Sequence, residues 1–351
     1  MPARVLVSLY FEGLGDIILL TPLIAALHKL YPTAAITLTM PEAYLALYAG
    51  HPYNVTAMAY DRHNVKTLWE LKRNGPYDIA IVPLASRQAW LARAVGARWI
   101  RGFVGDRWYY RLPIDELLPY PRSIVPFSDM WTDLAGERVD TLYDKADWPM
   151  PPLNQDLAIQ GPYVVLHLAA SSAVRNWEPG HWAQLAAMLT ERGLTVALTT
   201  GTNQSDLIHE VDPNGHYRHY PGDLSLVGLW HLLSSARLLV VPDTGVAHLA
   251  KLTQTPTVVL FGQCDPALYD PGRFWAEMPY RAVTVADLAC RDQPWFKNRP
   301  GILNDLKRCM RSLEDCHHDR TCMRALAVDQ VMRAAQELLD LGKPLTVDAC
   351  D

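Results

Sequence analysis

The stretch LLVVPDTGVAHLAKL, Leu238 to Leu252, combines the two patterns that decide the fold of this chain. It begins as a short, continuous apolar run, which is typical of a strand buried on both faces of a sheet. Asp243, Thr244 and Gly245 then open a helical pattern that carries His248. The first N–H groups of a helix lack partners within it, and the helix dipole adds partial positive charge there. The junction therefore predicts an anion site suited to a diphosphate, with the Thr244 hydroxyl as a further donor.

The same alternation of strand and helix extends along the whole chain. Apolar β-branched runs such as ARVLVSLY, YVVLHLA and TPTVVLF alternate with helical patterns such as HWAQLAAMLTERG, which predicts parallel sheets of the α/β class. The proline-rich segment DWPMPPLNQD is typical of a linker. With 351 residues, we expect two Rossmann-like, doubly wound domains, residues 1–155 and 156–351. They would face a central cleft, since open α/β sheets bind ligands at the carboxyl ends of their strands.

Composition and charge exclude several classes of protein. The chain is 50% hydrophobic and carries a formal net charge of -5, which argues against a nucleic-acid binder with a basic surface. No apolar signal core opens the sequence, and the apolar run from Ile17 to Leu27 is shorter than the roughly 20 residues of a membrane-spanning helix. We expect a cytoplasmic protein that is at most peripherally associated with a membrane.

The segment GLGDIILLTPLIAAL, Gly13 to Leu27, resembles a phosphate loop only in its glycines. The dinucleotide fingerprint needs a third glycine where this chain has Ile18. Asp16 would also repel a phosphate, whereas a helix start stabilises its ionised form by roughly 0.3–1 kcal/mol. An ionised carboxylate at a cleft can accept a proton from a hydroxyl, so Asp16 is either a general base or a helix cap.

Two further segments carry arginines in patterns that suit anions. HLAASSAVRNW, beginning at His167, places Ser171 and then Arg175 after a strand, where a guanidinium can meet a diphosphate leaving group without a metal. Residues 86–111 interleave arginines with Trp and Tyr, which can hold an anionic acceptor and a sugar ring. A solvated helix face or strand is the alternative for any one of these arginines. The candidates on this acceptor side are Gly15, Arg87 and Arg101.

Cysteines gather in one late segment of the chain. They are Cys290, Cys309, Cys316 and Cys322, with His317 and His318 between them. Thiolates bind zinc or iron, but the spacing contains no compact Cys-x-x-Cys pair. The alternatives are therefore a structural metal site and reduced, partly buried thiols.

Three segments together resemble glycosyltransferase family 9, the heptosyltransferases of lipopolysaccharide core assembly. They are GLGDIILLTPLIAAL, HLAASSAVRNWEPGHWAQLAAML and the run from Gly222 to Pro271, which contains PDTGVAHLA and PTVVLFG. The resemblance implies a GT-B fold of two Rossmann-like domains facing a cleft. It also implies inverting transfer from a nucleotide sugar, typically an ADP-heptose, with no cofactor required for catalysis.

The resemblance assigns roles to individual residues of this sequence. Asp16 falls on the family's catalytic base, and Arg175 falls where the family usually has a lysine that steadies the donor. The implied donor-binding residues are Ser171, Arg175, Asp243, Thr244, Gly245 and His248. The family tends to hold the ribose with an acidic residue where this chain has Ser205, so the nucleoside stays open. Some family members carry a cysteine-rich stretch like this one, and a set of them holds iron with cysteines.

The resemblance also implies partners. The N-terminal domain would hold an anionic, lipid-linked acceptor of the lipopolysaccharide-core type, at the inner face of the cytoplasmic membrane, and the C-terminal domain a nucleotide-sugar donor. The same chemistry on a protein acceptor, such as an autotransporter adhesin, or on a small metabolite is an alternative. A nucleotide-sugar-binding protein without turnover is the alternative from another class, and the presence of both Asp16 and Arg175 argues against it.

Overall fold

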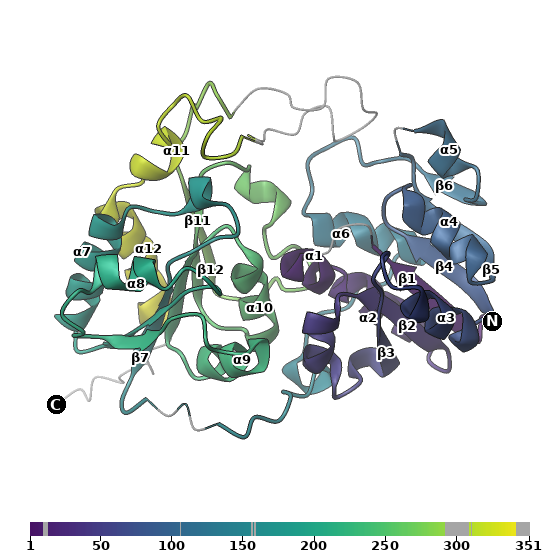
Figure 1. The fold of residues 1–351 in the computed structure, drawn as a ribbon, viewed down its shortest axis with the longest axis horizontal. Helices are drawn as coiled ribbons and strands as arrows, with labels where there is room; N and C mark the ends of the chain where they lie inside the picture. The colour runs from purple at the N-terminus through teal and green to yellow at the C-terminus, as the bar shows by residue number, and fades with distance from the viewer. Residues whose placement is uncertain are drawn as a thin grey trace, which may run out of the picture. The chain divides into compact units, whose positions relative to one another are not determined.

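The structure, a computed structural model, describes residues 1–9, 13–105, 107–155, 157, 159–291, 309 and 311–341. The chain forms two compact units, of which the first contains Met1–Asn154 and Cys264–Ala276 and the second contains Gln155–Gln263 and Glu277–Cys290. Each unit is built on a parallel sheet of six strands with helices between them (Figure 1). The predicted α/β class with two Rossmann-like units is therefore confirmed.

The sheet of unit 1 has the order β3-β2-β1-β4-β5-β6. Its strands are β1 (Arg4–Ser8), β2 (Ala35–Met40), β3 (Val55–Ala59), β4 (Tyr77–Val82), β5 (Ala97–Phe103) and β6 (Glu116–Leu118). Its helices are α1 (Leu14–Leu19), α2 (Thr21–Leu30), α3 (Val65–Asn74), α4 (Arg87–Ala94), α5 (Trp108–Arg111) and α6 (Phe127–Thr132). Short 3-10 turns are η1 (Glu42–Tyr48), η2 (Pro52–Asn54), η3 (Asp133–Ala135) and η4 (Lys145–Asp147).

The sheet of unit 2 has the order β12-β11-β10-β7-β8-β9. Its strands are β7 (Tyr163–His167), β8 (Thr195–Thr199), β9 (Arg218–Tyr220), β10 (Leu238–Pro242), β11 (Thr257–Phe261) and β12 (Tyr280–Thr284). Its helices are α7 (Pro179–Thr190), α8 (Asp206–Val211), α9 (Leu226–Ser234), α10 (Gly245–Thr253), α11 (Thr321–Arg324) and α12 (Val328–Leu341). The 3-10 turn η5 (Ala173–Arg175) follows β7, and η6 (Pro266–Leu268), in the segment assigned to unit 1, follows β11.

Burial explains why the central strands show no polar alternation. Every residue of β7, β10 and β11 is buried, because helices cover both faces of a parallel sheet. Helix α12 packs against α7, β11 and β12. Its buried residues recur at helical spacing and are Val328, Val331, Met332, Ala335, Leu338 and Leu339. The last described helix is thus an integral part of the core of unit 2.

Strand order reverses once in each sheet, and the reversal fixes where a ligand can bind. In unit 1 it lies between β1 and β4, and in unit 2 between β7 and β10. Open α/β sheets bind ligands beyond the carboxyl ends of the strands at such a point. The turns after these four strands carry most of the site residues predicted from the sequence.

Unit 1 also includes a segment that follows β11 of unit 2. Within Cys264–Ala276, the backbone N–H and the Nε of Arg273 donate to the Asp129 carboxylate at 3.0 and 3.2 Å. The carbonyl of Phe274 accepts from the N–H of Tyr143 at 2.8 Å. Gly272 has a φ of +65°, and a Cβ there would lie 2.5 Å from Asp129 Oδ1. Glycine is therefore required where this segment meets α6. Because this later segment of the chain belongs to unit 1, a single boundary near residue 155 does not separate the two units.

None of the helices in the described part of the chain combines the length and apolar character needed to span a bilayer.

Candidate functional site

Arg175 is the centre of the predicted donor site in unit 2. Its Nη1 donates to the backbone carbonyl of Asp243 at 2.6 Å and lies 3.6 Å from Asp243 Oδ2. Its Nη2 donates to Ser171 Oγ at 2.7 Å. The Arg175 side chain is 19% exposed and that of Asp243 is 8% exposed. Three residues predicted from two separate motifs thus meet where the strand order reverses between β7 and β10.

The start of α10 supplies the second part of this site. Thr244 is the N-cap residue with extended backbone, and its side chain makes no capping hydrogen bond. The Thr244 hydroxyl therefore accepts no hydrogen bond from the first N–H groups of α10. Those N–H groups, at Gly245 and Val246, also have no acceptor within the helix. The N–H of Asp243 pairs with the carbonyl of Leu260 at 3.0 Å, which holds the turn onto β11. This geometry suits a diphosphate, as the sequence predicts.

Two buried histidines stand beside these turns and are held neutral. Burial lowers the pKa of His167, at the end of β7, to about 4. Its Nδ1 lies 2.9 Å from Thr199 Oγ1 at the end of β8. Burial and then the positive charge of Lys251 lower the pKa of His248, on α10, well below its usual range. The neutral histidines thus add no positive charge to these turns, whereas the Arg175 guanidinium does.

Side-chain contacts hold the loop between β7 and α7 in shape. Asn176 Oδ1 accepts from the N–H of Ala170 at 2.9 Å, which closes the turn that carries Ser171 and Arg175. Gln204 Nε2, from the turn after β8, donates to the carbonyl of Ala170 at 3.1 Å. The loop between β7 and α7 is therefore held by one hydrogen bond within it and by another from the turn after β8.

The segment around α11 holds the far end of the same loop. Arg320 donates to the carbonyl of Asn176 at 3.3 Å and to Glu178 Oε1 at 2.6 Å. The buried indole of Trp177 donates to the carbonyl of Leu326 at 3.0 Å. Three consecutive loop residues are thus bound to residues 142 to 149 positions later. Sequence reasoning missed Arg320, which belongs to no motif, and gave no role to Glu178, which lies within one.

In unit 1, Asp16 lies in the first turn of α1, after β1, and is partly buried. Gly15 beside it is buried. A Cβ on Gly13, the N-cap residue, would lie 2.6 Å from Asp16 Oδ2. The carboxylate therefore folds back over the N-cap position, and Gly13 leaves room for it. This contact gives Gly13 a local function, which is to leave room for the carboxylate in the turn.

The acceptor-side arginines have different environments. Arg87 is the first residue of α4, after β4, so it belongs to the same edge of the sheet as Asp16. Gln88 fastens that helix start to β1, because its Nε2 donates to the carbonyl of Leu9 at 3.0 Å. Arg101 instead pairs with Glu116 at 2.8 Å and donates to the carbonyl of Leu134 at 3.2 Å. These contacts give Arg101 a structural role between β5 and β6.

The cysteines of the late segment do not form a metal centre in the described part of the chain. There, no three His, Cys, Asp or Glu side chains come together as metal ligands. Cys322 is buried, and its Sγ lies against Gly262, while Cys316 Sγ accepts from the N–H of Arg320 at 3.4 Å. The described cysteines form no disulfide with one another. The structure gives the metal alternative no support within these residues.

The structure defines an α/β protein of two Rossmann-like, doubly wound units. The predicted site residues lie in the turns after β1, β7 and β10. The family model described as glycosyltransferase family 9 (heptosyltransferase) matches residues 65–276, which is more than half of the chain. The chain belongs to this family and is a glycosyltransferase.

Individual proteins agree with this assignment. The chain is 27% identical over 327 residues to lipopolysaccharide heptosyltransferase 1 of Pseudomonas aeruginosa, covering 85% of this chain and 90% of that protein. It resembles the structure of E. coli ADP-heptose lps heptosyltransferase II, with a TM-score of 0.69 at 18% identity over 96% and 98% of the two chains. It also resembles the iron-containing dodecameric glycosyltransferase TibC of enterotoxigenic E. coli, with a TM-score of 0.60 at 18% identity over 97% and 77% of the two chains.

Replacing Arg320 by alanine should loosen the loop that carries Arg175. We expect nucleotide-sugar affinity to fall by about 5- to 20-fold, because a charge-assisted hydrogen bond contributes about 1.5–3 kcal/mol, partial exposure of this pair lowers that value, and part of the cost falls on stability. The matched control is Arg324→Ala, since Arg324 lies 3.8 Å from the same Glu178 and is 49% exposed. Titration calorimetry with the donor measures both variants. Equal affinities for Arg320→Ala and Arg324→Ala would contradict the prediction.

The neutral histidines should make unit 2 sensitive to acid. A histidine whose pKa is lowered on folding stabilises the fold fully above its unfolded pKa near 6.5, and this stability is lost as the pH falls toward the folded value. For His167, with a pKa of about 4, linkage gives a loss of about 2 kcal/mol at pH 5. Urea unfolding at pH 7.5 and pH 5 measures it. The His167→Gln variant should show a smaller difference between the two values, and an unchanged difference would refute this assignment.

Proposed function

We propose that this enzyme transfers a heptose from ADP-heptose to a lipopolysaccharide-core acceptor, with inversion at the anomeric carbon and without a metal ion in the chemical step. The observation that carries the proposal is the meeting of Arg175, Asp243 and Ser171 beside the start of α10. The names of the Pseudomonas relative and of E. coli heptosyltransferase II support the choice of heptose, ADP and lipopolysaccharide.

In the proposed reaction, Asp16 removes the proton from the acceptor hydroxyl as its oxygen attacks the anomeric carbon. The bond from that carbon to the diphosphate oxygen breaks, and the electron pair leaves with ADP. Arg175 and the first amides of α10 stabilise the negative charge that develops on the diphosphate. Asp243 contacts the transferred sugar, while Thr244, Gly245 and the neutral His248 line the diphosphate. An arginine and a helix start supply the charge that a metal ion supplies in other transferases.

Unit 1 would accordingly serve the acceptor and unit 2 the donor. We place the reaction at the inner face of the cytoplasmic membrane, where a lipid-linked acceptor would be available to a peripherally bound enzyme. The second candidate is the same chemistry on a protein acceptor. The cysteine-rich segment and the likeness of fold to iron-containing TibC favour it, whereas the described residues contain no group of metal ligands.

Replacing Asp16 by asparagine should remove the base and keep the shape of the turn. We expect kcat to fall by about 10²- to 10⁴-fold, which is the usual contribution of general base catalysis, while ADP affinity changes little. Transfer from ADP-heptose to de-heptosylated lipopolysaccharide core, followed by mass spectrometry, measures kcat. Transfer at the wild-type rate would show that Asp16 is not the base.

Donor binding can be tested without knowledge of the acceptor. ADP-heptose at about 100 times its Kd should stabilise the fold by about 2.7 kcal/mol, because it binds only the folded state. Thermal unfolding with ADP-heptose, UDP-glucose and GDP-mannose compares the nucleotides, with Arg175→Ala as the binding-deficient variant. Arg192→Ala is a suitable control, since Arg192 lies exposed in the same unit and pairs with Gln336. A response to UDP-glucose alone would refute the ADP-heptose donor.

A further inference from the structure

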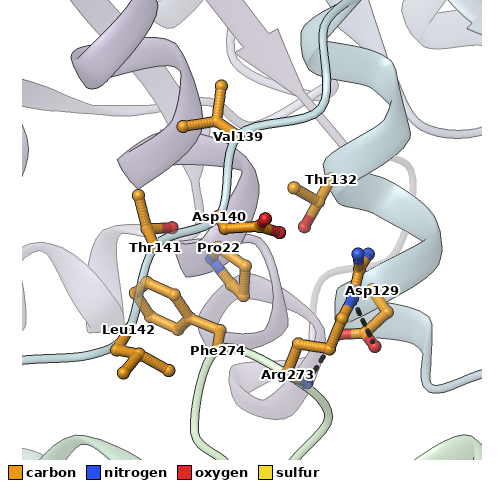
Figure 2. A pocket seen from close by; sticks show the side chains of 9 residues that line it. All are labelled: Pro22, Asp129, Thr132, Val139, Asp140, Thr141, Leu142, Arg273 and Phe274. Atoms are coloured by element: carbon orange, nitrogen blue, oxygen red, sulfur yellow. Dashed lines mark hydrogen bonds and ion pairs between the residues drawn. The ribbon is translucent and has the colours of Figure 1, made fainter.

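Two neighbouring pockets in unit 1 form one groove along helix α2. The first has a volume of about 400 Å³ and is shown in Figure 2. The second has a volume of about 740 Å³. Asp140, Thr141 and Leu142 line both, so the two pockets adjoin along this segment, and we call them together the groove. The first reaches Pro22 near the start of α2, and the second reaches Lys29 near its end.

The groove begins next to the helix that carries the proposed base. Only Leu20 separates α1 from α2, so Pro22 lies just beyond the last turn of α1. From Pro22 to Lys29 a helix rises about 10 Å, which is about the length of two linked sugar rings. The groove thus leads from the end of α1 toward the opposite edge of the sheet.

The walls of the first pocket suit a carbohydrate. Figure 2 shows the side chains of Thr132, Asp140 and Arg273 directed toward the same space, with Phe274 and Pro22 as apolar neighbours. Arg273 is 45% exposed and is held in place through its Nε by Asp129 at 3.2 Å. Hydroxyl, carboxylate and guanidinium groups bind sugar hydroxyls, and apolar rings cover the C–H faces of a sugar.

The second pocket contains polar atoms that the protein itself does not satisfy. His28 Nδ1 and Tyr53 Oη are buried, and neither has a hydrogen-bond partner among the residues that the structure describes. An unsatisfied buried polar group costs about 1–3 kcal/mol. Burial, Asp147 and Asp144 raise the pKa of Tyr53, so its hydroxyl stays protonated and is a hydrogen-bond donor.

Backbone strain is found at the same place. His51, Tyr53 and Asn54 have left-handed φ values of 48°, 52° and 58°. Each such residue costs about 1–3 kcal/mol and is typical of ligand sites, where the surrounding structure maintains the strain. The strained turn directs Tyr53 into the pocket wall, where its ring lies 6.3 Å from that of His28.

We propose that the groove binds successive sugars of an oligosaccharide acceptor, with the sugar nearer the reacting hydroxyl at its Pro22 end, just beyond α1, and a second sugar against His28 and Tyr53. This inference rests on the proposed function, because it assigns a binding site to the acceptor of that reaction. The groove is lined by side-chain hydroxyl, carboxylate and imidazole groups and not by an open strand edge. An extended peptide typically pairs with such an edge, so the lining favours a carbohydrate over a peptide.

Variants along the groove test the proposal through acceptor length. Tyr53→Phe and Thr141→Val each remove one hydroxyl, and we expect each to raise the KM for an oligosaccharide acceptor by about 5- to 20-fold, as for the loss of one buried hydrogen bond. The KM for the donor should stay constant. With an acceptor trimmed to the reacting sugar, the Tyr53→Phe variant should match the wild type.

Tyr48→Phe is the matched control. The hydroxyl of Tyr48 is also buried and unsatisfied within the described residues, and its ring also contacts Trp148, at 4.8 Å against 6.5 Å for Tyr53. Tyr48 does not line either pocket, so its variant should keep the wild-type KM. An equal effect of Tyr48→Phe and Tyr53→Phe, or the same KM for all variants, would overturn the groove. A Tyr53→Phe effect that appears only with a protein acceptor would overturn the carbohydrate assignment.

Direct binding separates this inference from the proposed function. Saturation-transfer NMR with de-acylated, de-heptosylated core oligosaccharide should show contact with the wild type and a weaker signal with Tyr53→Phe, in the absence of any donor. If this difference is seen and no ADP-sugar is turned over, the groove stands and the proposed reaction fails. If ADP-heptose is turned over and the signal is unaffected by Tyr53→Phe, the groove fails and the reaction stands.

Discussion

The bond between Arg175 and Asp243 is the interaction on which the donor side of this enzyme depends. The two residues are 68 positions apart and meet because β7 and β10 are neighbours where the sheet order reverses. Arg175 donates to a carbonyl and to the Ser171 hydroxyl, which are neutral acceptors. The nearest carboxylate oxygen of Asp243 lies further away, at 3.6 Å. The hydrogen bonds therefore orient the guanidinium through neutral acceptors, while the Asp243 carboxylate offsets part of its charge at the longer distance.

Arg175 keeps this orientation only if the loop between β7 and α7 is held in place, and contacts at three loop residues hold it. Asn176 closes the loop from within, and Trp177 and Glu178 join it to the segment around α11. That segment lies beyond residue 276, where the match to the family model ends. Its role follows from packing: α11 and α12 complete the core of unit 2 and hold the donor loop at the same time.

The fold, and the meeting of Ser171, Arg175 and Asp243 at one edge of the sheet, could be predicted from the sequence because they depend on local patterns. Buried parallel strands produce continuous apolar runs, and turns after adjacent strands meet at one edge of the sheet. Arg320 could not be found in this way, since its partner Glu178 is 142 positions away and salt bridges leave no local pattern. Arg101 shows the opposite failure. The register of β5 and β6 places Arg101 opposite Glu116, and the two side chains form an ion pair. The sequence alone does not distinguish such an arginine from one that binds a ligand.

In unit 1, the proposed base and the proposed acceptor groove belong to two consecutive helices. Gly13 leaves room for the Asp16 carboxylate at the start of α1, and α2 follows as one wall of the groove. A second sugar would bind about 10 Å along α2 from the first. Its binding energy raises the rate of transfer only if it helps to orient the reacting hydroxyl. On the proposed function, the helix pair would perform that conversion, because α1 and α2 are mostly buried and only Leu20 separates them. The α1–α2 junction would then affect acceptor selection although it does not itself line the groove.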